Sequence, residues 1–193
     1  MSELVQAAKL NREAFGQLFN QFYSIIFAYC LRRLLLRAVA EDVTSEIFLK
    51  VAGQIAEFPG TTGEDFRRWL FRIATNEINA YLRQTIRRRE LLEAAVQLGQ
   101  VDASACTELL DDDSPVGWEE VYRAIEQLSE TEQSIISLRF FGGLKHDQIA
   151  EVLGLSSTSV RMKLSRSLAK LRKQLQGIEQ TPMGSQPPED GES

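Results

Sequence analysis

The sequence has few of the residues that build disulfide frameworks, metal centres and membrane spans. Of its 193 residues, two are cysteines, one is a histidine and five are prolines. Cys30 lies in an apolar run and Cys106 in an acidic stretch far along the chain, so we expect no disulfide and interpret Cys30 as a core thiol. The longest apolar run, Ile25 to Leu31, is too short to cross a bilayer. The first residues, MSELVQAAKLNRE, lack a basic start followed by an apolar core, so we expect no secretory signal, no membrane insertion and a cytoplasmic location.

The sequence also lacks an arrangement of residues typical of catalysis. His146 has no cysteine or carboxylate cluster at metal-ligand spacing, and we assign it to the surface or to a helix start. The acidic run Asp111–Asp113 could hold Mg²⁺ in principle, but it stands close to Pro115, and the phosphate-binding pattern GxxxxGK[ST] does not occur. We therefore predict that the protein is not an enzyme and has no catalytic residues, no cofactor and no metal.

Acidic residues are concentrated in two segments of the chain, which as a whole has a formal net charge of −5. Residues 99–117 and 177–193 contain nine Asp and Glu and no Lys or Arg, whereas residues 1–98 and 118–176 each have a net charge of +2. The two acidic segments are rich in small residues or in Pro and Gly. We predict that the first is a flexible linker and the second a disordered tail.

Apolar residues recur at helical spacing in both mildly basic segments, and we find no convincing alternation of the kind that a β-strand shows. Ser129 and Glu132 have the spacing of a capping box. Pro and Gly crowd into a loop over residues 57–63. We expect helices over residues 10–36, 39–55, 64–97, 118–128 and 129–141. The predicted fold is therefore all-α, with two small helical domains, residues 1–98 and 118–176, joined by the acidic linker.

A helix, a tight turn and a second helix are predicted from Leu144 to Lys173. Gly154 ends the first helix, and Ser156 is placed to cap the second by accepting a backbone N–H. Apolar residues of the second helix are spaced to form one buried stripe, namely Val160, Leu164, Leu168 and Leu171. From Ser156 to Lys173 there are six cations and no acid. This pattern is typical of a helix-turn-helix motif, whose second helix enters the major groove of DNA.

The segment from Phe66 to Glu90 has a second pattern, of arginine and asparagine side chains. Steps of four, three, four and four residues place five of them on one helical face, namely Arg72, Asn76, Asn79, Arg83 and Arg87. Arg and Asn bind phosphates and read guanine and adenine edges. Aromatic residues near these cations, such as Phe58, suit unstacked single-stranded bases. The alternative is a solvated polar face on a packed helix.

Two stretches of the chain resemble a known family. AEDVTSEIFLKV (40–51), the loop FPG (58–60) and DFRRWLFRIATNEINAYLRQTIRRR (65–89) are similar to region two of bacterial RNA polymerase sigma factors. LSETEQSIISLRFFGGLKHDQIAEVLGLSSTSVRMKLSRSLAKLR (128–172) is similar to region four. Because only a short linker separates the two regions, the chain resembles the extracytoplasmic-function group of this family.

The resemblance implies roles for individual residues. Asp42, Glu46 and Leu49 would contact core RNA polymerase. The residues that would capture the melted −10 strand of a promoter are Phe58, Thr61, Thr62, Arg72, Asn76, Asn79, Arg83 and Arg87. The residues that would read the −35 duplex are Thr158, Arg161, Met162, Lys163, Ser165 and Arg166. The implied function is that of a sigma factor, which directs core RNA polymerase to promoter DNA, and an anti-sigma factor is a further candidate partner.

Two other interpretations stay open. A stand-alone helix-turn-helix regulator that binds DNA as a dimer would explain residues 118–176 but not the pattern over 65–89. A helical module that binds only proteins would not explain the acid-free helix. A dimeric regulator should bind a palindrome alone, whereas a sigma factor should gain specificity only with core polymerase.

Overall fold

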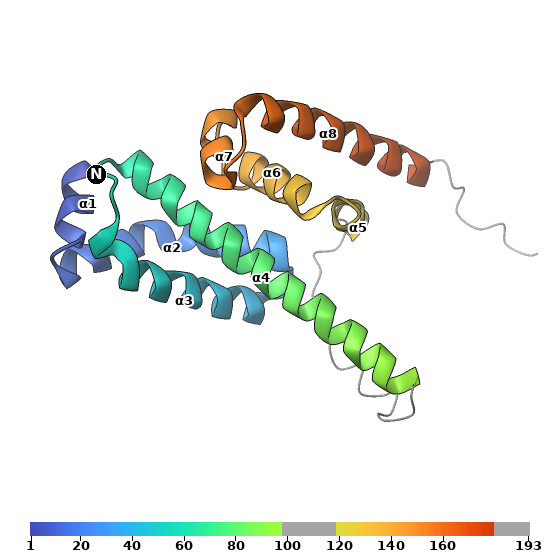
Figure 1. The fold of residues 1–193 in the computed structure, drawn as a ribbon, viewed down its shortest axis with the longest axis horizontal. Coiled ribbons are helices and arrows are strands. Elements are labelled where there is room, and N and C mark those ends of the chain that lie inside the picture. Colours follow the sequence, from blue (N-terminus) through green and yellow to red (C-terminus); the bar gives the residue numbers. More distant parts are fainter. Residues whose placement is uncertain (98–118, 180–193) are drawn as a thin grey trace, which may run out of the picture.

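The computed structural model describes residues 1–97 and 119–179, and in these ranges it is helical without a strand, which confirms the predicted all-α class. The N-terminal half contains α1 (Ser2–Ala8), α2 (Arg12–Leu34), α3 (Arg37–Gln54), the 3₁₀ turn η1 (Ile55–Glu57) and α4 (Gly63–Gln97). The C-terminal half contains α5 (Glu119–Glu126), α6 (Glu130–Phe140), α7 (His146–Leu153) and α8 (Ser157–Glu179). Figure 1 shows that α1–α4 form a bundle from which the end of α4 protrudes, and that α8 is the outermost helix of the other half.

The helix ends differ from the predicted ones by a few residues. The short helix α1 was not predicted, because it buries only Val5 and Ala8 and so shows too little periodicity. Between α2 and α3, Leu35 adopts a left-handed conformation with φ of 64°. Leucine rarely adopts this conformation, so the sequence gives no sign of the turn. The predicted linker, 99–117, lies outside the described residues. So does most of the predicted tail, although α8 continues to Glu179.

The predicted helix caps are present. Gly154 ends α7 in the left-handed region, with φ of 66° and ψ of 35°. Ser156 Oγ accepts the backbone N–H of Ser159 at 3.1 Å, before α8. In the capping box of α6, the Ser129 side chain bonds the Glu132 backbone and the Glu132 side chain bonds the Ser129 backbone. These local signals therefore place the helix-turn-helix as expected.

The predicted buried stripe of α8 is wrong at one position. Val160, Leu164 and Leu171 are buried, but Leu168 is 39% exposed. Ser167 is fully buried instead, and its hydroxyl donates to the carbonyl of Lys163 at 2.8 Å. The buried set has Ser167 in place of Leu168, so its steps from Val160 to Leu171 are four, three and four residues. At 3.6 residues per turn, these positions stay closer to one face of the helix than the predicted steps of four, four and three. The hydrogen bond to the preceding turn makes a buried serine acceptable there.

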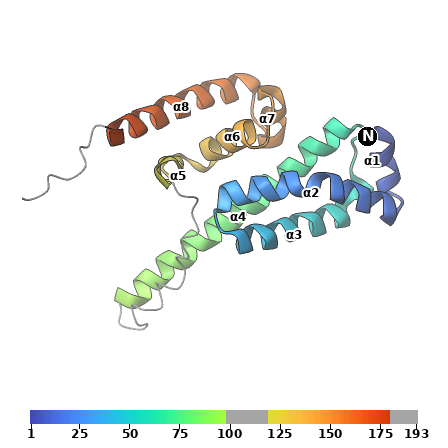
Figure 2. The ribbon, with the colours of Figure 1, turned by 180° about the vertical axis from the view of Figure 1, so that it is seen from behind.

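The two halves pack against each other along α4, and α6 and α7 lie beside α4 in both ribbon views (Figures 1 and 2). The ring of Phe71 on α4 is fully buried. A Cβ atom added to Gly142, in the turn between α6 and α7, would lie 3.1 Å from this ring and 2.8 Å from the carbonyl of Leu138. Arg67 donates to the carbonyl of Gly142 at 2.8 Å. Glycine at position 142 therefore permits the close approach of the halves.

Cys30 is a buried free thiol on α2, which confirms its assignment to the core. Burial raises the pKa of this thiol to about 11. Because the thiolate is the reactive form, Cys30 is protected both by its burial in the bundle and by a raised pKa that keeps the thiol protonated.

Candidate nucleic-acid interface

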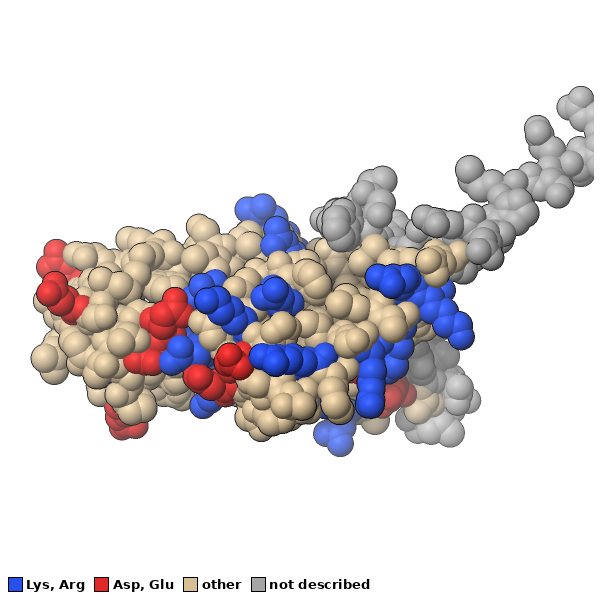
Figure 3. All heavy atoms as spheres, turned by 90° about the horizontal axis from the view of Figure 1, so that it is seen from above, with Lys and Arg blue, Asp and Glu red and all other residues tan. Residues whose placement is uncertain are grey.

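The residues predicted to read the −35 duplex lie on the outer side of α8. Thr158, Arg161, Met162, Ser165 and Arg166 are exposed, and Lys163 is half-buried. The opposite side of the helix buries apolar side chains that pack on α6 and α7. Seen from the side of α8, Lys and Arg are spread over the half of the face where α8 lies, and most of the visible Asp and Glu lie toward the other half (Figure 3). The outer side of α8 is therefore a cationic surface that a DNA groove can reach.

The residues predicted to bind the −10 strand begin in the loop between η1 and α4. Phe58 is only 6% exposed, and its ring stacks on Trp69 with centroids 4.7 Å apart. Thr61 and Thr62 are exposed. Their backbone N–H groups donate to Asp65 Oδ2 at 3.2 and 3.0 Å, and the Thr62 hydroxyl donates to the same oxygen at 2.7 Å. These bonds, led by that of the Thr62 hydroxyl, lower the pKa of Asp65.

Asn79 is the most enclosed of the predicted −10 residues on α4, with 8% exposure. Its Nδ2 donates to Ser134 Oγ on α6 at 3.2 Å. Its Oδ1 accepts a hydrogen bond from Arg33 on α2 at 3.0 Å. In this arrangement both polar atoms of the amide have partners within the protein, and the side chain is largely closed to solvent.

Besides Arg67, three basic side chains of α4 contact the C-terminal half. Arg72 donates to the backbone carbonyl of Glu151 on α7. Arg68 forms an ion pair with the Glu151 carboxylate, with Nε and Oε2 2.6 Å apart. Arg83 Nη1 donates to both carboxylate oxygens of Glu130 at 2.8 and 2.9 Å. The face of α4 that was predicted to bind the −10 strand therefore lies partly against α6 and α7.

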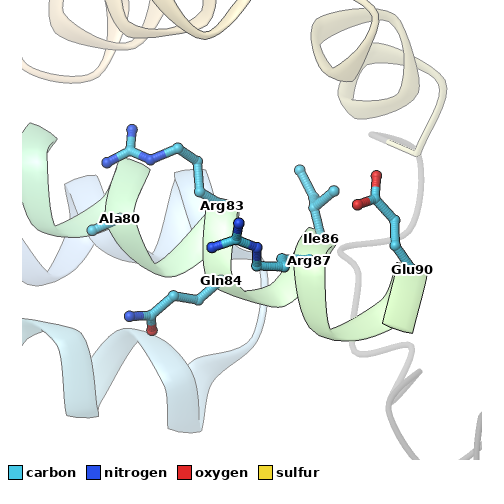
Figure 4. A pocket seen from close by; sticks show the side chains of 6 residues that line it. All are labelled: Ala80, Arg83, Gln84, Ile86, Arg87 and Glu90. Carbon is cyan, nitrogen blue, oxygen red and sulfur yellow. The ribbon is translucent and has the colours of Figure 1, made fainter. Parts of the chain in front are cut away.

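The two predicted −10 residues of α4 not yet described, Asn76 and Arg87, are exposed. Arg83 and Arg87 line a groove of about 540 Å³ together with Ala80, Gln84, Ile86 and Glu90. In Figure 4, Arg83 and Ile86 point toward the C-terminal half, whereas Gln84 points the other way. The roles of these residues toward DNA stay predictions.

The residues predicted to contact polymerase form one exposed row on α3. Asp42 and Glu46 are exposed, and Leu49 has 72% of its surface open to solvent. Val43 and Ile47, on the other side of the same helix, are buried. An exposed leucine beside two carboxylates gives this row both an apolar and an acidic component.

Sequence reasoning missed Arg33 and Lys9. The contacts of Arg33 lie 46 and 100 residues away in the sequence, and that of Lys9 lies 51 residues away. No local pattern marks such positions.

Within residues 1–97 and 119–179, no group of His, Cys, Asp and Glu could hold a metal, and none of the helices is long and apolar enough to span a membrane.

Two family models match this chain over most of the described residues. The model for Sigma-70 region 2 matches residues 18–89, and that for Sigma-70, region 4, matches residues 118–171. These matches place α4 in the first region and the helix-turn-helix in the second.

Named relatives are similar over nearly the whole chain. It is 30% identical over 176 residues to the ECF RNA polymerase sigma factor BldN of Streptomyces coelicolor, covering 89% of this chain and 65% of BldN. It is 28% identical to the RNA polymerase sigma factor YlaC of Bacillus subtilis, covering 86% of this chain and 94% of YlaC. It is also 28% identical to the ECF RNA polymerase sigma factor SigL of Mycobacterium tuberculosis, covering 92% and 98%.

Solved structures share the fold. CnrH, solved in complex with the cytosolic domain of CnrY, has a TM-score of 0.64 and 24% identity, covering 91% of this chain and 97% of CnrH. The sigma factor RpoE of Bartonella quintana, solved with the anti-sigma factor NepR, has a TM-score of 0.61 and 18% identity, covering 84% and 96%. The chain belongs to the sigma-70 family of bacterial RNA polymerase sigma factors, and within it to the extracytoplasmic-function group.

Proposed function

We propose that this chain binds core RNA polymerase and directs it to promoters, without enzymatic activity of its own. The N-terminal half would contact the polymerase through α3 and the −10 strand through α4, and α8 would contact the −35 duplex. The observation that carries the proposal is the acid-free, exposed face of α8 in a chain that also matches the region 2 model. This activity would place the protein in the cytoplasm, with an anti-sigma factor as a further partner. Residues 1–98 and 118–176 would be its two functional domains.

Promoter reading in this proposal requires the two halves to separate. Asn79 is 8% exposed and donates to Ser134 on α6, so a base can reach it only after the C-terminal half has moved away. Separation would also release Arg72 and Arg83 from α7 and α6. Contact with polymerase would supply the free energy for this opening by binding the separated form more tightly.

Run-off transcription with purified core polymerase and a promoter library tests the proposal. The full chain should co-elute with core polymerase and add specific transcripts that core polymerase alone does not make. Leu49→Asp, in the exposed row of α3, should abolish both effects. Leu10→Asp alters a leucine that is 94% exposed at another site and should leave both effects intact. Failure of the unaltered chain in both assays, with tight binding to a palindrome alone, would favour the dimeric regulator instead.

A further inference from the structure

The loop between η1 and α4 is held by residues that precede the segment matched to region 2. Lys9, just after α1, donates from Nζ to the carbonyl of Gly60 at 2.9 Å. The same ammonium lies 5.3 Å from the centroid of the Phe58 ring. Gln6 on α1 donates to the carbonyl of Gly60 at 3.3 Å. A charged donor and a cation–π contact thus come from one side chain.

Lys9 is held in position because α1 itself is anchored. Val5 is fully buried and Ala8 is 4% exposed, so α1 is fixed on the bundle. The side chain of Met1 covers the start of α4, where a Cβ atom on Gly63 would lie 2.0 Å from Met1 Cγ. The end of α1 that bears Lys9 therefore has a defined place relative to the loop.

On its other side the loop is held by α4. The Phe58 ring stacks on Trp69, and a Cβ atom on Gly60 would lie 2.3 Å from that ring and 2.6 Å from Asp65 Cβ. With Phe58 stacked and the Gly60 carbonyl bonded, the chain leaves Thr61 exposed. Lys9 is the side chain that joins the aromatic ring and the carbonyl. Its removal would leave the Gly60 carbonyl with the weaker bond from Gln6 and the Phe58 ring with its contact to Trp69, so the hold on the loop would loosen.

We propose that Lys9 is a positioning residue for the −10 contact: its ammonium holds the Gly60 carbonyl and the Phe58 ring, and thereby fixes the exposed part of the loop for DNA. The proposal rests on the proposed function of this loop in reading the −10 strand. The competing role for a lysine at this place is a direct phosphate contact, which would weaken binding to all sequences alike and lower the salt slope by about one.

The test compares Lys9→Met, which removes the charge and keeps most of the stem, with Lys9→Arg, which keeps the charge and the donors. Arg12→Met removes an exposed cation at the start of α2, three residues from Lys9, and serves as the control. All variants carry Trp118→Phe, so that Trp69 is the sole tryptophan of the two in the chain. Two quantities are measured: acrylamide quenching of Trp69 in the free protein, and holoenzyme binding to forked promoter DNA with altered −10 bases at two salt concentrations.

Lys9→Met should increase the quenching of Trp69 and reduce the discrimination among −10 variants by about tenfold, the change expected from losing one charge-assisted bond. Lys9→Arg should restore both, and Arg12→Met should change neither. Unchanged quenching would overturn the proposal, and so would a sequence-independent loss of affinity with a reduced salt slope. If the unaltered holoenzyme shows no −10 preference, the proposed function fails, and the quenching measurement still decides whether Lys9 holds the loop.

Discussion

Arg33 on α2 donates from Nη2 to Asn79 Oδ1 on α4 at 3.0 Å, although 46 residues separate them in the sequence. Its Nη1 donates to Gln133 Oε1 on α6, also at 3.0 Å. One guanidinium therefore joins the N-terminal bundle to the C-terminal half. Burial lowers the pKa of Arg33, and the planar fork of donors suits two acceptors on different helices.

Replacing Arg33 by alanine should destabilise the packed arrangement of the two halves. The side-chain oxygens of Asn79 and Gln133 would lose a charged donor in a partly buried place, at a cost of ~2–4 kcal/mol in the free energy of unfolding. Urea unfolding followed by circular dichroism measures this change. Arg32→Ala is the matched control, because Arg32 is exposed and lies over the Phe141 ring at 5.3 Å, a contact worth ~1 kcal/mol or less. Equal losses for both variants would refute the bridging role.

Weakening the contact between Arg83 and Glu130 should favour the separated form. Both side chains are largely exposed, so Glu130→Gln should cost at most ~1 kcal/mol of stability. The same change should tighten the binding of a fluorescent single strand of −10 sequence to the free protein, since Arg83 is then released. Glu41→Gln removes the acid from a comparable exposed pair with Arg37 on α3 and controls for net charge. Identical gains in both variants would show that only the net charge matters.

Arg166 should contribute to promoter discrimination, whereas Lys173 should contribute mainly to non-specific affinity. Both are exposed on α8, and Arg166 lies one turn beyond Met162 on the outer side, whereas Lys173 lies about two turns further on. Arg166→Ala in holoenzyme should cost ~1–3 kcal/mol of discrimination among −35 variants. Lys173→Ala should leave that preference unchanged and lower the salt slope by about one. Binding to a −35 library at two salt concentrations separates the two effects, and equal, sequence-independent losses would contradict the assignment.

Protonation of the Glu132 carboxylate in acid should make the C-terminal half less stable. A hydrogen bond from Lys170, followed by bonds from Ser129, lowers the pKa of Glu132 from 4.5 to about 2. Because the folded value is the lower one, the stabilisation is fully present above pH 4.5 and is lost as the pH falls toward 2.

Glu132→Gln should therefore reduce the slope of unfolding free energy against pH between 4.5 and 2, measured by urea unfolding. Glu126→Gln, which removes an exposed carboxylate from α5, serves as the control for charge. If Glu132→Gln keeps the slope of the unaltered chain, the bonds of Glu132 do not stabilise the fold in this way.

The sequence by itself determined the features that depend on near neighbours. Gly154, Ser156 and the capping box of Ser129 and Glu132 marked helix ends correctly, because a cap is satisfied within four residues. The resemblance to region four supplied the predicted −35 residues, most of which are exposed on the outer side of α8. The similarity to sigma regions two and four was also visible, because motif order and spacing are properties of the chain alone.

Only the tertiary structure decided which surface each helical face meets. The periodicity of α4 put Asn79 and Arg83 on one polar face but could not reveal that α6 lies against it. Phe58 looked like a ring available to DNA bases, whereas it packs on Trp69. Arg33 and Lys9 had no signal at all, because their partners lie 46 to 100 residues away. A helical pattern determines the direction in which a side chain points from the axis of its helix. Contacts between distant helices depend instead on how the whole chain packs.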